Sequence, residues 1–184
     1  MENNKAVVIG LNDITKILDQ ALESCKKSDS KFKNILFYRE TGFGVNDIVE
    51  RRIHSHRDEY SSMHGIMPGV LHTYDENMIL KKVIENGKYI YLFDDEYLAK
   101  LTETKILFFE NLNYGTLKEQ YEQIAPIVND RKYISPFFKK EYIFNNLQLF
   151  IGTCYPNNGR YHVNDIPDSM FENCEVYCVD TGRY

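Results

Sequence analysis

The chain has 184 residues, of which 43% are hydrophobic and 27% charged, and its formal net charge is -5. This length suits a single domain with one core, here residues 1–184, and the composition is that of an ordinary soluble protein. No apolar run is long enough to cross a membrane, and the polar first residues lack the apolar core of a secretion signal. We therefore expect a cytoplasmic protein without membrane contact, whose acidic balance argues against binding nucleic acid through bulk charge.

The cysteines and histidines predict no metal site. The four cysteines are scattered without a C-x-x-C pair, so reduced thiols in the core are expected rather than disulfides or zinc ligands. His54 and His56 stand two apart, which places them on different sides of a helix. A solvated helix end explains them better than a metal cluster.

Strand and helix patterns alternate along the first half of the chain. A short apolar strand at 6–9 precedes an amphipathic helix at 10–27, for which Asn12 or Asp13 would be the cap. A strand at 35–38 ends in a glycine turn, after which helical spacing resumes at Val45. Residues 60–74 are expected to form a loop or short strand, and residues 75–86 a helix that stops at Gly87.

The second half continues the alternation. It contains a strand at 89–93, a short helix at 94–104 and an apolar run at 105–109 that suits a central parallel strand. Thr116 and Glu119 form a capping-box pair before a helix that Pro126 should kink or break. Strands at 147–151 and 175–179 follow, and the whole pattern predicts an α/β domain with a mostly parallel sheet.

The glycine turn after the second strand has the spacing of a phosphate-binding loop. The sequence from residue 35 is ILFYRETGFGVN, in which Gly42 and Gly44 make the turn. In the pattern G-x-x-x-x-G-K-[ST], the lysine meets the β/γ-phosphates and the hydroxyl holds Mg²⁺. Here Arg39 stands at the first glycine, Val45 at the lysine and Asn46 at the hydroxyl. The turn is retained without the charge that hydrolysis needs, although such turns are also common without a ligand.

Three later segments extend this pattern into a family resemblance. KILFFENLN at 105–113 resembles the metal-holding strand of AAA+ ATPases, which usually ends in Asp-Glu. LFIGTCYP at 149–156 is similar to the fourth strand of the MoxR-type branch. GRYHVNDIPDSMFENCEV at 159–176 is similar to that branch's Y-x-V-x-x-L-P-x-A-L-x-x-R-F-x-x-I-x-V segment. With the glycine turn, four ordered segments resemble a AAA+ core from about residue 9 to residue 180.

This resemblance implies a fold. It is the three-layer αβα sandwich of P-loop NTPase (AAA+) type, with the strands at 35–38, 106–109, 147–151 and 175–179 in one largely parallel sheet. In the family a small helical lid with a second sensor arginine would follow the last strand. Because the chain ends at Tyr184, the lid is expected to be absent.

The resemblance also implies which positions would carry the chemistry, and every one that can be placed is changed. The lysine falls on Val45, and the Mg²⁺-binding hydroxyl falls on Asn46. The Asp-Glu pair falls on Glu110 and Asn111, the sensor on Tyr155, and the arginine that acts across a subunit interface on Asn173. Because phosphoryl transfer depends on these charges, hydrolysis is not expected.

Binding of ATP is a separate question from hydrolysis. Gly42, Gly44 and the following helix N-terminus could still offer N–H groups to an anion. The lysine is lost, however, and Glu40 and Asp47 add negative charge nearby, so no cofactor is expected beyond weak ATP and Mg²⁺ binding.

Arg39 and Glu110 could fill the vacated pocket. Each replaces a family residue on opposite sides of the same phosphate site, so their side chains could pair there. The alternative is that both are solvated at strand ends, where an exposed ion pair adds about 0–1 kcal/mol.

An aromatic and basic stretch near residue 140 predicts an interaction surface. Exposed rings beside cations could anchor a protein or stack single-stranded nucleic acid, and the acidic balance favours the protein. The candidate residues are Tyr133, Phe137, Phe138, Lys139, Lys140 and Tyr142.

The sequence therefore predicts an inactive AAA+-like protein that acts as a scaffold or regulatory subunit, with an intact AAA+ ATPase as the candidate partner. The first alternative is an active or nucleotide-binding ATPase with non-standard motifs, in which Arg39 replaces the lysine and Glu110 holds Mg²⁺. The second is a module that binds single-stranded nucleic acid.

Overall fold

A six-stranded sheet forms the centre of the computed structural model, which describes residues 6–26, 32–40, 44–66, 80–85, 87–114, 118–136, 139–160, 163–167 and 173–180. The strand order is β1-β10-β2-β9-β6-β3, and every pairing is parallel. The six strands are β1 (Val7–Gly10), β2 (Lys33–Tyr38), β3 (Ser62–Ile66), β6 (Ile106–Glu110), β9 (Leu149–Cys154) and β10 (Cys174–Asp180).

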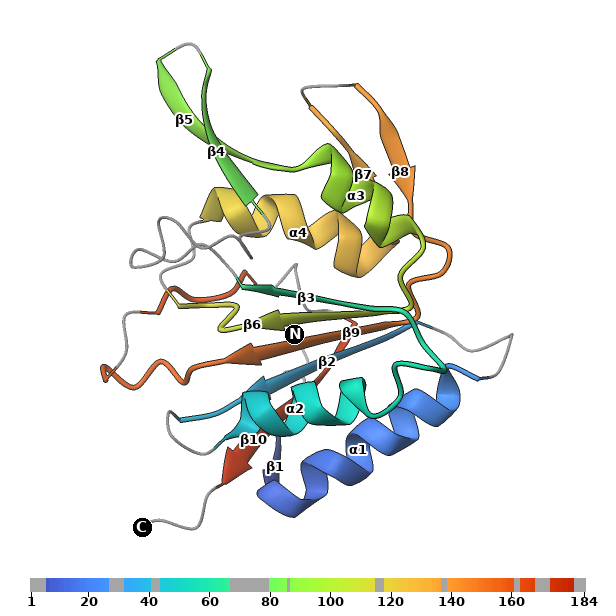
Figure 1. Cartoon of the computed structure of the whole chain (residues 1–184). Helices are drawn as coiled ribbons and strands as arrows, with labels where there is room; N and C mark the ends of the chain where they lie inside the picture. The colour runs from blue at the N-terminus through green and yellow to red at the C-terminus, as the bar shows by residue number, and fades with distance from the viewer. Residues whose placement is uncertain are drawn as a thin grey trace.

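Helices cover both faces of this sheet (Figure 1). On one face, α1 (Leu11–Ser24) and α2 (Val45–His54) pack on a core cluster that includes Ile35 and Phe108. On the other, α3 (Asp95–Thr102) and α4 (Lys118–Asp130) pack on a cluster that includes Leu36 and Phe109. Alternate residues of each strand thus face alternate layers. The expected αβα sandwich is confirmed, with its predicted strands in one parallel sheet.

Two hairpins lie outside the main sheet, on the same side as α3 and α4 (Figure 1). One joins β4 (Leu80–Glu85) to β5 (Lys88–Phe93), and the other joins β7 (Lys132–Ile134) to β8 (Glu141–Ile143). Among the described helices, none is long and apolar enough to cross a membrane.

Close packing in the sheet centre requires a small residue in β9. All six residues of β9 are buried, as expected for a strand covered on both faces. A Cβ added at Gly152 would stand 2.7 Å from Cδ2 of Leu36 in the neighbouring strand. Glycine at this position leaves room for the Leu36 side chain, so that the neighbouring strands β2 and β9 can pack side by side.

The first helix begins earlier than its expected cap. Gly10 is the N-cap, and its N–H donates to Oδ2 of Asp13 at 3.2 Å. Asp13 therefore stabilises the helix start from the first turn rather than from the cap position, where it was expected.

The helix predicted at 75–86 is wrong where the structure describes it, because Leu80–Glu85 form β4. Val83 pairs with Ile90 and Ile84 with Tyr89 across the hairpin. The Asn86-Gly87 sequence between apolar runs is a hairpin signal, and Gly87 has a φ of 74°. The periodicity of so short a segment does not separate helix from strand, so the turn residues decide. Residues 75–79 and 86 lie outside the described part.

The other predicted elements match the structure with shifted ends, whereas β7 and β8 form in the stretch around residue 140, where no strand was predicted. The loop or short strand at 60–74 contains β3, and residues 67–74 lie outside the described part. α4 continues through Pro126 to Asp130, so the proline does not break it, and Thr116 of the expected capping box is not among the described residues. The four cysteines are free, as expected.

Candidate functional site

Three strands bring the substituted positions together at their carboxyl ends. Arg39 directly follows β2, Asn111 follows β6 and Tyr155 follows β9. Because these strands are parallel neighbours, their carboxyl ends share one edge of the sheet, where α/β proteins place their ligand sites. The N–H of Arg39 donates to the carbonyl of Cys154 at 2.8 Å, which extends the β2–β9 pairing to the site.

The side chain of Arg39 occupies the centre of this edge. Its Nε donates to Oδ1 of Asn46 at 3.1 Å, and its Nη2 donates to Oδ1 of Asn111 at 2.6 Å. The guanidinium carbon lies 4.8 Å from the ring centroid of Tyr155, a cation–π distance. Only 7% of Arg39 is exposed. A buried cation is thus held by two neutral amides and an aromatic face.

Asn111 is positioned by an unusual backbone conformation. Its φ is 53°, in the left-handed region that asparagine tolerates better than most residues. Its N–H donates to Oγ1 of the fully buried Thr153 at 3.1 Å, and the N–H of Leu112 donates to the Thr153 carbonyl at 2.8 Å. The turn after β6 is therefore fixed to β9, which places the Asn111 amide opposite Arg39.

Asn113 fixes the position of Tyr155. The Asn113 Nδ2 donates to the carbonyl of Tyr155, and the N–H of Tyr155 donates to Asn113 Oδ1, both at 2.8 Å. This buried side chain continues the β6–β9 ladder beyond its last backbone pair. The ring centroids of Tyr155 and Tyr114 lie 5.5 Å apart. The Tyr155 ring therefore lies close to both the Tyr114 ring and the Arg39 guanidinium.

The start of α2 contributes backbone but no cation. Gly44 is the N-cap with a φ of 64°. Val45, which the resemblance places at the lysine position, is 1% exposed and packs in the core between α1, α2 and the sheet. Asp47 lies in the first turn of the helix. Gly42 lies outside the described residues.

The two other predicted site residues are placed differently. Glu110 is the half-buried last residue of β6, whereas the hydrogen bonds of the Arg39 side chain go to Asn46 and Asn111, not to the glutamate named in the pairing hypothesis. Asn173 directly precedes β10, whose first residue Cys174 is level with Asn34 of β2. It therefore lies about one strand length, roughly 16 Å, from the carboxyl edge.

Burial keeps the thiol nearest to Arg39 inert. The pKa of Cys154 is raised above its usual range because the thiol is fully buried, and the Arg39 charge only partly opposes this. A protonated, inaccessible thiol is a poor nucleophile. Cys154 is therefore not expected to act as a nucleophile at this edge.

The predicted aromatic surface is wrong for two of its residues. Tyr133 and Tyr142 are each 4% exposed, because the alternation in β7 and β8 turns them inward. Lys139 and Lys140 are exposed, and Lys140 Nζ lies 4.5 Å from the Tyr142 ring centroid and 3.7 Å from Asp95 Oδ2. Phe137 and Phe138 lie outside the described residues.

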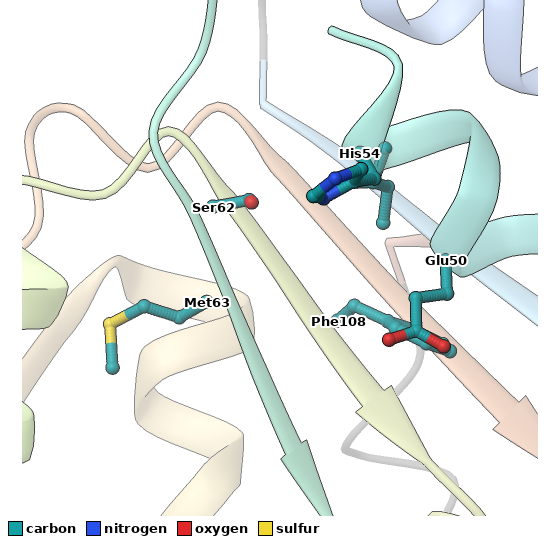
Figure 2. Close-up of a pocket in the computed structure, with 6 residues that line it drawn as sticks. Glu50, His54, Ser62, Met63 and Phe108 are labelled. Carbon is teal, nitrogen blue, oxygen red and sulfur yellow. The ribbon is translucent and has the colours of Figure 1, made fainter. Parts of the chain in front are cut away.

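A pocket of about 140 Å³ lies between α2 and the edge strand β3, away from Arg39. Figure 2 shows Glu50 and His54 extending from α2 over the strands that carry Ser62 and Phe108. The part of the chain that the structure describes holds no group of three or more metal-ligating side chains, there or elsewhere.

The comparison with solved structures agrees with the fold. A protein of Cytophaga hutchinsonii, described as a "putative ATPase", superposes with a TM-score of 0.57 at 11% sequence identity over 95% of this chain. The chain spans about half, 47%, of that neighbour's length. No protein-family model and no curated protein sequence matches the chain. The similarity shows a shared α/β fold and does not extend to activity.

Asn113 and Thr153 are the site residues that the sequence reasoning did not single out. A signal was present, since the Asn-x-Asn spacing after β6 puts two short amides at a strand end, where they bond to backbone. Thr153 gave no such signal, because a threonine within a buried strand is ordinary.

Proposed function

We propose that this chain is a catalytically inactive AAA+-like protein, a pseudo-ATPase that serves as a scaffold or regulatory subunit. The observation that carries the proposal is the Arg39 side chain, which is buried between Asn46, Asn111 and Tyr155. The resemblance assigns these three positions to the Mg²⁺-binding hydroxyl, the metal-holding acid and the polar sensor. A guanidinium therefore lies where the metal and phosphate would need space and ligands.

The charges around the site support the same proposal. Hydrolysis of a phosphate anhydride needs cations or a metal aimed at the developing charge. Val45 is in the core and cannot supply one. An amide at residue 111 is a weaker Mg²⁺ ligand than a carboxylate, and the Asn46 oxygen already accepts from Arg39.

A phosphate-release assay on purified protein with Mg-ATP tests the proposal. We expect no turnover above that of a heat-denatured sample, for the natural chain and for Glu110→Gln alike. Mg²⁺-dependent turnover that Glu110→Gln abolishes would refute the pseudo-ATPase.

One observation favours the rival, a nucleotide-binding protein with non-standard motifs. Arg39 puts a cation beside the α2 N-terminus, and its side-chain hydrogen bonds go to neutral amides rather than to a carboxylate. In that case Arg39 would take the role of the lysine. Arg39→Ala would then weaken ATP binding at least about tenfold. Under the pseudo-ATPase proposal the natural chain does not bind ATP measurably, so the same substitution would change nothing.

The partner follows from the proposed role. A subunit without turnover acts by occupying a place in an assembly, so we propose a protein partner, with an intact AAA+ ATPase as the first candidate. Co-expression with the ATPase encoded nearest to this gene, followed by co-purification, tests it. ATP and Mg²⁺ binding at this site is proposed to be weak or absent.

Nucleic acid is the less favoured partner. Two of the rings that would stack bases are buried, and the chain carries net negative charge. A titration with single-stranded DNA at two salt concentrations should show no steep, salt-dependent binding.

A further inference from the structure

The outer edge of β7 borders a groove whose other wall is α4. The groove has a volume of about 370 Å³. The helix contributes the stripe Glu122, Gln123, Pro126 and Asp130, and the strand segment contributes Lys132, Tyr133, Ile134 and Pro136. No described residue of β8 lines the groove, so it lies on the side of β7 that faces away from its hairpin partner.

Backbone groups of β7 point toward this side. The Phe144 N–H donates to the Arg131 carbonyl at 2.8 Å, and the Ser135 N–H donates to the Lys140 carbonyl at 2.9 Å. Bonded and non-bonded pairs alternate in an antiparallel ladder, so Lys132 and Ile134 belong to the non-bonded pairs. Their N–H and C=O groups are directed away from β8, toward the groove.

A proline interrupts the regular hydrogen bonding of the facing helix. Pro126 lies within α4 and has no N–H, so the carbonyl of Glu122 lacks its usual donor one turn later. Both residues line the groove.

The side chains define what could bind between these walls. Ile134, which is 60% exposed, joins Pro126, Pro136 and Tyr133 as the apolar part. The lining carboxylates are Glu122 and Asp130, against one lining ammonium, Lys132; Glu122 also pairs with Lys118 at 3.7 Å, and Lys132 pairs with Glu141. This balance favours a basic ligand and disfavours a nucleic acid.

We propose that the groove binds an extended segment of a partner protein, which adds a strand to the outer edge of β7. The segment alternates apolar residues, packed against Ile134, with Lys or Arg near Glu122 and Asp130. Main-chain hydrogen bonds to Lys132 and Ile134 give the binding, and the two carboxylates select the charge. The proposal does not depend on the state of the nucleotide site.

The test uses a fluorescein-labelled peptide, Ac-KVKVKV-NH₂, titrated with the full chain and followed by anisotropy. We expect saturable binding with a Kd below about 1 mM, and none for Ac-EVEVEV-NH₂ or for the basic peptide N-methylated at every second residue. Glu122→Gln combined with Asp130→Asn should weaken binding and reduce its dependence on salt.

A matched pair of proline variants locates the binding edge. Ile134→Pro removes an N–H on the groove side, and Ile143→Pro removes one on the outer edge of β8, where Ile143 pairs with Lys132. Proline is tolerated at such edge positions, and circular dichroism confirms that both variants fold. Ile134→Pro should lose about tenfold in affinity, more than Ile134→Ala, whereas Ile143→Pro keeps it.

Five results would overturn the proposal, and the first four concern the peptides and the variants. They are no saturable binding of the basic peptide, equal binding of the acidic one, equal losses in the two proline variants, and a loss in Ile134→Ala as large as in Ile134→Pro. Displacement of the peptide by single-stranded DNA would assign the groove to nucleic acid instead and would also overturn it.

Discussion

Nη2 of Arg39 lies 2.6 Å from Oδ1 of Asn111, a contact between residues 72 positions apart in the chain. It joins the end of β2 to the turn after β6, across the intervening strand β9. A hydrogen bond from a buried charged donor, Arg39, to the oxygen of the half-buried Asn111 amide is of the charge-assisted kind, which is stronger than one between neutral groups. The arginine thus stabilises the edge of the sheet at which, in a nucleotide hydrolase of this fold, a ligand would bind.

Replacing Arg39 by leucine should destabilise the protein by about 2–3 kcal/mol, because two amide oxygens lose a charged donor. Urea unfolding followed by circular dichroism measures this. Arg160→Leu is the control, since the Arg160 side chain makes an exposed 3.3 Å ion pair with Glu40. That variant should change stability by under about 1 kcal/mol. Equal effects of the two substitutions would show that Arg39 has no special structural role.

Asn113→Ala should cost about 1–3 kcal/mol, because it leaves the buried N–H and C=O of Tyr155 without their partners. The exposed Asn157, whose amide contacts Asp165, provides the comparison Asn157→Ala. Thermal melts of both variants decide the point. A melting temperature for Asn113→Ala within a degree of that for Asn157→Ala would contradict the described bridge.

Gly152→Val should destabilise by roughly 1–3 kcal/mol or more, since its Cβ would stand 2.7 Å from the Leu36 side chain in a filled core. Gly10→Ala is a mild comparison, because its added Cβ meets nothing closer than 3.6 Å. Chemical denaturation of both gives the difference. A fully stable Gly152→Val variant would mean that the β2–β9 packing differs from that described here.

Alkaline pH should destabilise the chain partly through Cys174. Burial raises the pKa of this thiol from 9.0 to about 12, so the folded state keeps a proton that the unfolded state releases. The contribution to stability is complete below pH 9 and is lost progressively between pH 9 and about 12, by at most about 1.4 kcal/mol per pH unit. Denaturation midpoints at pH 8, 9 and 10 should fall less steeply for Cys174→Ala than for the natural chain. Parallel slopes would contradict this.

The order of strands and helices could be predicted from the sequence because most elements carry a clear period or an unbroken apolar run. The prediction failed at β4, where a six-residue segment has no unambiguous period, and the Asn86-Gly87 turn together with pairing to Tyr89 and Ile90 determines its conformation. The prediction that Tyr133 and Tyr142 are exposed was wrong for a related reason. Tyr133 and Tyr142 alternate with exposed Ile134 and Ile143, and the sequence does not tell which set faces α4.

The sequence predicted which residues form the candidate site better than it predicted the contacts between them. The resemblance named Arg39, Asn46, Asn111 and Tyr155, and the structure places these four together. The partner of Arg39 could not be predicted, because Glu110 and Asn111 are consecutive and the left-handed backbone at Asn111 turns the amide toward the guanidinium. That the cluster descends from a nucleotide site stays a prediction.

A thermal melt with millimolar Mg-ATP tests the central claim most directly. A ligand at 100 times its Kd stabilises the folded state by about 2.7 kcal/mol, which corresponds to several degrees for a domain of this size. For the natural chain we predict no shift, because Arg39 occupies the site and Val45 supplies no cation. Gly44→Trp, which blocks the turn at the head of α2, should give the same flat response. A rise of several degrees that Gly44→Trp abolishes would show that the glycine turn still binds nucleotide, and would contradict the account.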